Sequence, residues 1–199
     1  SVTLKNGASN IYTIFGDATT TLSLPAAYQE AAPFGANVGG VAAAFIAAAP
    51  TAGMDSWLTV GPTGGDPAGS LSSIGIDFAS WTASAGLTAD NGAVFWMSPN
   101  SGPSGTVVVA QVSIAAGSSA SVTLGAQGRS TTGVDWKNDG LSFALSGGGG
   151  GTPPPPPPPS ADNCDLSVAA VSSAGGFDTY QLSVTLKNGA SNIYTIFGD

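Results

Sequence analysis

The strongest constraint on this sequence is that it repeats itself. Residues 183–199 (SVTLKNGASNIYTIFGD) are identical to residues 1–17. A match of this length does not arise by chance, so the chain has a period of 182 residues and contains one period plus the start of the next. We therefore expect a periodic object in which each unit is one domain with a linker.

A β-strand spans the point at which the second copy begins. In residues 179–187, Tyr180, Leu182, Val184 and Leu186 alternate with polar residues, which is typical of a strand with one buried face. The second copy shows this strand whole, whereas the first copy starts in its middle. Because a domain does not normally begin halfway along a core strand, we expect that residue 1 is not a biological start and that the body at 1–146 lacks its first strands.

The missing strands carry enough apolar surface to decide whether the body folds alone. Burial of a large apolar side chain contributes roughly 1.5–3 kcal/mol, so the five in the stretch 165–182 contribute about 10 kcal/mol, comparable with the net stability of a whole domain. We therefore predict that residues 161–199, as the opening strands of the next unit, complete a neighbouring body. The residues predicted to make this contact are Leu166, Val168, Val171, Tyr180, Leu182, Val184, Leu186, Ile193 and Ile196.

Short alternating segments predict the fold class. Residues 106–115 form the clearest one, with four apolar side chains on one face. Turns rich in Gly, Pro and Asn separate such segments, so we expect an all-β antiparallel sandwich, jelly-roll-like, of about ten strands. Residues 41–49 (VAAAFIAAA) are ambiguous, because alanine favours a helix whereas the neighbouring segments favour a strand; we expect a strand. Residues 131–139 are expected to form a polar loop.

Composition excludes several classes of function. The chain has four Lys and Arg residues against twelve Asp and Glu, a net charge of −8, so we expect no nucleic-acid binding through phosphate neutralisation. No apolar run approaches the roughly 20 residues of a membrane helix, and we expect no membrane span. With so few charges, solubility is expected to depend on Ser, Thr, Gly and attached sugar.

The absence of histidine limits the possible chemistry. Without it, the Ser-His-Asp and Cys-His nucleophilic systems and any His-ligated metal site cannot be built. Residues 135–140 (DWKNDG) have a faint likeness to a calcium loop, but Lys137 stands where an oxygen ligand is needed. We therefore predict that the chain is not an enzyme and that it holds no metal and no cofactor.

The single cysteine of each period, Cys164, cannot form a disulfide within its own domain. It is either a buried free thiol at the start of a strand or the site of a bond to another chain, since a lone cysteine in a secreted protein suggests such a bond. The sequence leaves both interpretations open.

Trp57 is the one candidate for a ligand contact. It shares a face of the expected strand 55–60 with Asp55 and Thr59, while Leu58 and Val60 face the other way. An exposed tryptophan ring at this position would offer a platform on which a sugar stacks. The alternative is packing in the core or at a subunit interface, where aromatic side chains dominate.

A linker follows the body at residues 147–160. Its glycines (147–151) allow a flexible joint, and the seven prolines 153–159 are expected to form a polyproline II spacer of roughly 20 Å. The segment TPPPPPPPS resembles the spacers of hydroxyproline-rich glycoproteins of green algae and plants, in which hydroxylated prolines and nearby serines carry O-linked sugar. That resemblance implies O-glycosylation candidates at Thr152, Pro153, Pro154, Pro155, Pro156, Pro157, Pro158, Pro159 and Ser160.

The repeat, the incomplete body and the spacer together predict a structural role. A β-domain and a polyproline spacer in identical succession resemble the glycan-coated surface fibrils of aquatic microbes. We expect an extracellular or cell-surface fibril of identical copies joined head to tail by strand donation. A repeated carbohydrate-binding or adhesin module is the alternative. A body that is closed on its own, with the tail free or packed back on it, would argue against strand donation.

Overall fold

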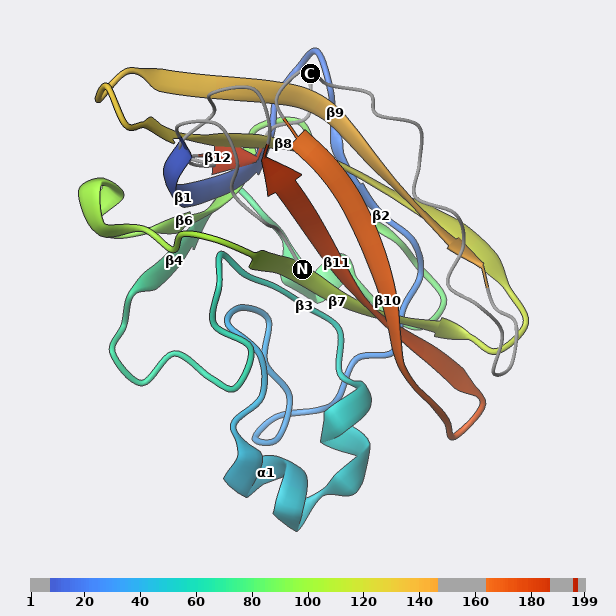
Figure 1. The fold of residues 1–199 in the computed structure, drawn as a ribbon. Helices are drawn as coiled ribbons and strands as arrows, with labels where there is room; N and C mark the ends of the chain where they lie inside the picture. Colours follow the sequence, from blue (N-terminus) through green and yellow to red (C-terminus); the bar gives the residue numbers. More distant parts are fainter. Residues whose placement is uncertain (1–7, 147–163, 187–194, 197–199) are drawn as a thin grey trace.

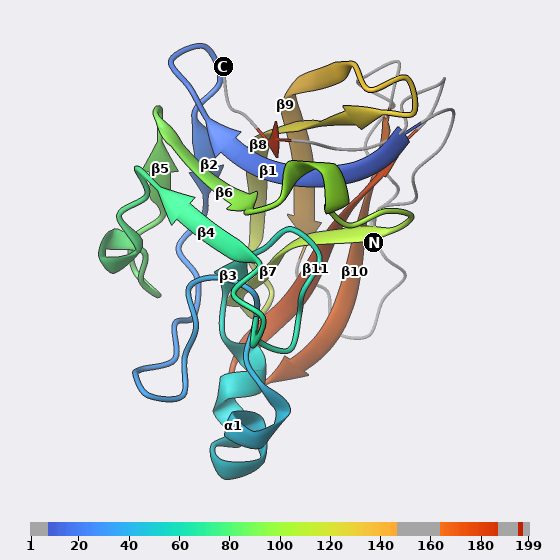
Figure 2. The same ribbon diagram turned by 90° about the vertical axis from the view of Figure 1, so that its left-hand side faces the viewer.

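The structure is a computed structural model that describes residues 8–146, 164–186 and 195–196. Its strands form two antiparallel sheets packed against each other (Figures 1 and 2). The predicted all-β antiparallel sandwich is confirmed. The strands are β1 (Ala8–Gly16), β2 (Leu22–Leu24), β3 (Trp57–Leu58), β4 (Leu71–Ile74), β5 (Leu87–Ala89), β6 (Gly92–Trp96), β7 (Val107–Ala115), β8 (Ser119–Ser130), β9 (Asp135–Ser146), β10 (Cys164–Ala174), β11 (Phe177–Leu186) and β12 (Thr195–Ile196).

The larger sheet has eight strands and is organised around β8. Its main path is β4-β6-β1-β8-β2-β5, and both β9 and β12 also pair with β8. The ladder between β8 and β9 runs from Ser119↔Ser146 to Arg129↔Asp135 and shifts register between Leu124 and Gly128. Strand β1 lies between β6 and β8, so it is hydrogen-bonded along both edges.

The smaller sheet has four strands in the order β10-β11-β7-β3. Its inner strands β11 and β7 are joined by a long antiparallel ladder. Strands β7 and β3 precede the linker in the sequence, whereas β10 and β11 follow it. This sheet is therefore built from two separate parts of the chain.

One apolar core fills the space between the sheets. It contains Ile11 and Ile14 of β1, Phe143 of β9, and Val112 of β7, all almost inaccessible to solvent. Because each strand alternates its side chains between two faces, each contributes about every second residue to this layer. The hairpin formed by β10 and β11 contributes Leu166, Tyr180 and Leu182 to the same core.

The expectation of a strand at residues 41–49 is wrong. The segment forms the helix α1 (Ala43–Ala48), followed by the 3₁₀ helix η1 (Pro50–Met54). The other two 3₁₀ turns are η2 (Phe78–Ser80) and η3 (Pro99–Ser101). Helix α1 lies at one end of the sandwich with no buried residue (Figure 1). A helix satisfies its own backbone groups without a strand partner, so the alanine preference prevails there. No helix in the described residues is long and apolar enough to cross a bilayer.

The expected polar loop at residues 131–139 is also shorter than predicted. Strand β9 already begins at Asp135, which pairs with Arg129 of β8. Their side chains form an ion pair with a nitrogen to oxygen distance of 3.2 Å. This ion pair spans the ladder, and the neighbouring Trp136 packs against the apolar core. Both contacts favour an extended segment here.

Candidate assembly site

The β10–β11 hairpin is the part of the chain predicted to complete a body. Its ladder runs from Cys164↔Leu186 to Ala174↔Phe177, and the loop consists of Gly175 and Gly176. Both glycines have positive φ, 60° and 82°. Two-residue hairpin loops need such a conformation, and glycine adopts it without strain. The two glycines therefore allow the tight turn between β10 and β11 without backbone strain.

The hairpin joins the body through β7. Strand β11 pairs with β7 from Phe177↔Ala115 to Val184↔Val107. In the middle of this ladder the hydroxyl groups of Ser113 and Thr179 are 2.7 Å apart and buried, so one donates to the other. At its glycine end, the Phe177 ring packs against the Tyr28 ring with centroids 5.0 Å apart. The edge of β7 is thus covered along most of its length.

Three of the predicted contact residues enter the core. Leu166 is 5% exposed, Tyr180 3% and Leu182 0%, and Val168 is half-buried against the same cluster. The prediction for Val171 is wrong, because its side chain is 47% exposed. The β10–β11 ladder shifts register between Ala170 and Ser172, so Val171 is the extra residue of a bulge and the alternation breaks there. The side chains of Val184, Leu186, Ile193 and Ile196 lie outside the described residues.

Tyr180 connects the hairpin to the larger sheet. Its hydroxyl donates a hydrogen bond of 2.8 Å to the carbonyl oxygen of Ser146, the last residue of β9. Burial, reinforced by the negative charge of Asp178, raises the pKa of the Tyr180 phenol. Asp178 itself accepts from the Ser173 hydroxyl at 2.7 Å and from the Gly117 backbone N–H at 3.2 Å. Polar contacts therefore hold the hairpin to both sheets.

The other edge of β7 is fixed by Gln111 and Asp55. The Gln111 amide donates to the carbonyl oxygens of Gly53 and Asp55 at 3.1 and 2.8 Å. The Asp55 carboxylate is 1% exposed and accepts from the backbone N–H groups of Glu30, Ala36 and Ser56 at 2.8, 2.6 and 3.0 Å. Burial raises the pKa of this carboxyl to about 6, although the three donors act in the opposite direction. Through Asp55 and Gln111, these bonds connect the loop before α1 to strand β7.

Trp57 does not offer a sugar-stacking platform. Its side chain is 2% exposed and packs in a small cluster with Val41 and Ala52. Of the two interpretations of Trp57, packing in the protein interior is therefore the one that the structure bears out, because Val41, together with Ala52 of η1, covers the ring. Trp81 is equally buried, and its indole N–H donates to the Pro25 carbonyl at 2.8 Å.

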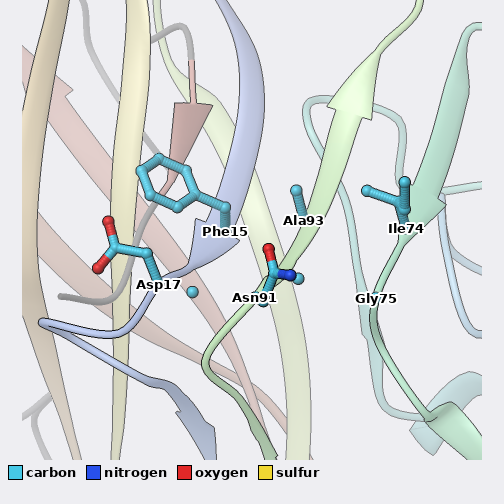
Figure 3. A pocket seen from close by; sticks show the side chains of 8 residues that line it. Phe15, Asp17, Ile74, Gly75, Asn91 and Ala93 are labelled. Atoms are coloured by element: carbon cyan, nitrogen blue, oxygen red, sulfur yellow. The ribbon is translucent and has the colours of Figure 1, made fainter.

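A shallow hollow of about 350 Å³ lies at the end of β1 (Figure 3). Phe15 and Asp17 line one side of it and Ile74, Asn91 and Ala93 the other. Asp17 pairs with Lys137 of β9 at 3.2 Å. The Lys137 ammonium also lies 5.7 Å from the centre of the Phe15 ring, so the hollow marks where the end of β1 is held.

Several sequence predictions fall outside the part of the chain that the structure describes. These are the polyproline spacer, the O-glycosylation candidates 152–160 and the side chain of Cys164. Among the described residues no cluster of acidic, His or Cys side chains could hold a metal ion. Comparison with protein-family models, curated proteins and solved structures finds no match to this chain.

Proposed function

We infer that this chain is a structural subunit of an extracellular fibril in which the hairpin of one unit completes the body of the next. The observation that supports this most is the composition of the four-stranded sheet, half of which comes from beyond the linker. A body of residues 8–146 has no other strand for this edge of β7 among the described residues. Completion of the body by a separate segment is therefore the event on which assembly depends.

The energetics support the same reading. Leu166, Tyr180 and Leu182 are buried in the body's core, and at roughly 1.5–3 kcal/mol each they contribute about 5–9 kcal/mol. The Ser113–Thr179 and Tyr180–Ser146 hydrogen bonds add to this. Since a domain's net stability is about 5–15 kcal/mol, whatever supplies the hairpin decides whether the body is stable.

In the structure the hairpin packs on the body of its own chain, the arrangement that argues against strand donation for one chain taken alone. The body is not closed without it, however, and the only covalent link between the two is the segment 147–163. The same contacts formed with a neighbour would give an interface that repeats without closing, and such interfaces generate strings. In a chain with a 182-residue period, each hairpin also leads directly into the next body.

The linker contributes spacing and sites for glycans in this proposal. Its sequence, a glycine run followed by seven prolines between Thr152 and Ser160, supports a stiff spacer with one soft joint. O-linked sugar on this segment would keep neighbouring units apart and soluble at a low content of charged residues. Mass spectrometry of material from the native source tests for hexose or pentose additions on residues 152–160.

Shortening the linker tests strand donation. Ser146 is bonded to Tyr180, and Cys164 pairs with Leu186, six residues further along β11, so the two linker ends lie about 20 Å apart along the strand. Deleting residues 148–162 leaves two linker residues, which span at most about 11 Å. The hairpin can then no longer reach its own β7. We expect concentration-dependent strings in light scattering and electron microscopy.

The matched control keeps the length of the linker and changes only its stiffness. Replacing the prolines 153–159 with alternating Gly and Ser leaves all 17 residues of the segment 147–163, so closure on the same body stays possible and the protein stays monomeric. Short-linker chains that remain monomeric at high concentration, with the hairpin amides exchanging freely with solvent, would refute the proposal.

A further inference from the structure

The two copies of the repeated segment pair with the same residues of β8. In the first copy, Thr13 pairs with Gln127 and Ile14 with Ala126. In the second copy, Thr195 pairs with Gln127 and Ile196 with Ala126, also antiparallel. Thr195 and Ile196 are the same residues as Thr13 and Ile14 one period later. The register on β8 therefore follows from the sequence of the segment, not from its place in the chain.

Only one segment can occupy the place that β1 fills. Between β6 and β8, β1 is paired on both edges, and Ile11, Ile14 and Phe15 are 0%, 0% and 3% exposed. We call this place the β1 position. Strand β12 lies beside β1 and β8 (Figure 1), and it pairs with β8 where the ladder with β9 is interrupted between Leu124 and Gly128. The second copy thus reaches the edge of a position that the first copy already holds.

The far end of the β1 position is selective for this sequence. A Cβ atom on Gly16 would lie 1.8 Å from the Ala89 carbonyl oxygen and 2.5 Å from the Leu22 backbone nitrogen, so only glycine fits there. The next residue, Asp17, is held by Lys137. The second copy repeats both residues. Of the segments in this chain, only the two copies place these two residues directly after the apolar pattern Ile-x-x-Ile-Phe that the β1 position buries.

We propose that the β1 position is an exchange site, and that its second occupant is the second copy of the 17-residue segment, from the same chain or from another copy of the chain. When a string forms as proposed above, the hairpin and the second copy enter one body as a continuous segment, with β11 on β7 and the copy on β8. The first copy then acts as a cap that keeps an isolated chain closed. This part of the inference rests on the proposed function, whereas exchange within one chain does not.

Either copy would make the same contacts in the β1 position, because their sequences are identical. Their competition is therefore decided by how each is tethered, as in other cases of domain swapping. Weakening the first copy alone must then transfer the site to the second copy, while weakening the second copy alone must leave an isolated chain unchanged.

Three variants test this. Ile196→Asp is expected to leave thermal unfolding unchanged, because the first copy holds the site. Ile14→Asp introduces a charge at a fully buried position, yet the chain is expected to stay folded with the second copy in place. The double variant, which leaves no competent occupant, is expected to raise the unfolded population about 100-fold or more over Ile14→Asp. Equal destabilisation of Ile14→Asp and the double variant would overturn the inference.

A disulfide trap identifies the occupant directly. In an Ile14→Asp, Cys164→Ser background, Phe95→Cys and Thr195→Cys place thiols on residues that pair only if the second copy holds the β1 position, because Phe95 pairs with Thr13 there and β12 pairs only with β8 among the described residues. We expect crosslinking under mild oxidation. A ladder of crosslinked chains shows exchange between chains, and a crosslinked monomer shows exchange within one chain, which supports the inference but counts against strings. A folded protein that does not crosslink would contradict it.

Discussion

The two sheets of the sandwich differ in where their strands come from. Apart from β12, every strand of the eight-stranded sheet precedes the linker, whereas the four-stranded sheet takes β3 and β7 from one side of the linker and β10 and β11 from the other. The first sheet can therefore form as soon as its own segment folds. The four-stranded sheet forms only when the β10–β11 hairpin meets β7. The eight-stranded sheet is thus built almost entirely from one part of the chain, whereas the four-stranded sheet requires both parts.

Release of the β10–β11 hairpin from β7 should produce the largest loss of stability. Leu182→Asp places a charge at a position with no solvent exposure on the β11 strand. A buried charge without a partner costs several kcal/mol, so we expect the hairpin to leave β7 and the free energy of unfolding to fall by about 5 kcal/mol. Denaturant unfolding followed by tryptophan fluorescence measures this.

Val171→Asp is the matched control, because it introduces the same charge on the same hairpin at a site that is 47% exposed. Its expected change is within about 0.5 kcal/mol. Comparable losses in the two variants would contradict the assignment of β11 as the anchoring strand.

The acceptor side of the same sheet should show a pH dependence. The pKa of Asp55 is about 6 in the folded protein against an ordinary value of 3.8. The folded state therefore binds more protons than the unfolded state between these values, so this group stabilises the fold below about pH 4 and its contribution falls as pH rises to about 6. The loss amounts to on the order of 3 kcal/mol.

Asp55→Asn removes this titration. The difference in unfolding free energy between the parent and Asp55→Asn is expected to narrow as pH rises from about 4 to about 7. The negative charge of Glu30, whose backbone N–H donates to the Asp55 carboxylate, also raises the pKa of Asp55. Glu30→Gln is therefore expected to reduce the pH dependence slightly without removing it. Parallel pH profiles of the parent and Asp55→Asn would rule out this role.

Loss of the hydrogen bond between Tyr180 and Ser146 is expected to change the free energy of unfolding less than the two preceding substitutions of buried residues. Tyr180→Phe keeps the buried ring and removes only the hydroxyl that donates to the Ser146 carbonyl. Such a bond contributes about 1 kcal/mol, so the expected loss of stability is of this size, without release of the hairpin. Hydrogen exchange of the β11 amides distinguishes this from the Leu182→Asp result, since those amides remain protected in Tyr180→Phe.

The sequence was sufficient for the elements that depend on local patterns. Alternation in residues 179–187 predicts the strand β11 and the burial of Tyr180 and Leu182. It was not sufficient for Val171, because a bulge inserts one residue and shifts the alternation. For Trp57 the sequence left two interpretations open, because the residues that cover its ring, such as Val41 and Ala52, come from segments without a strand alternation. The sequence also did not predict that both copies pair with the same β8 residues.

The positions of the linker ends have a mechanical consequence for a string under tension. Force would enter a body at Cys164, which pairs with Leu186 beyond the Val107 end of β7, and leave at Ser146, which pairs with Ser119, four residues after the Ala115 end of that strand. The pull would thus run along the strands, so the hydrogen bonds of the β11–β7 ladder would be loaded in shear and share the load. A force perpendicular to the strands would instead break the hydrogen bonds of the ladder one after another.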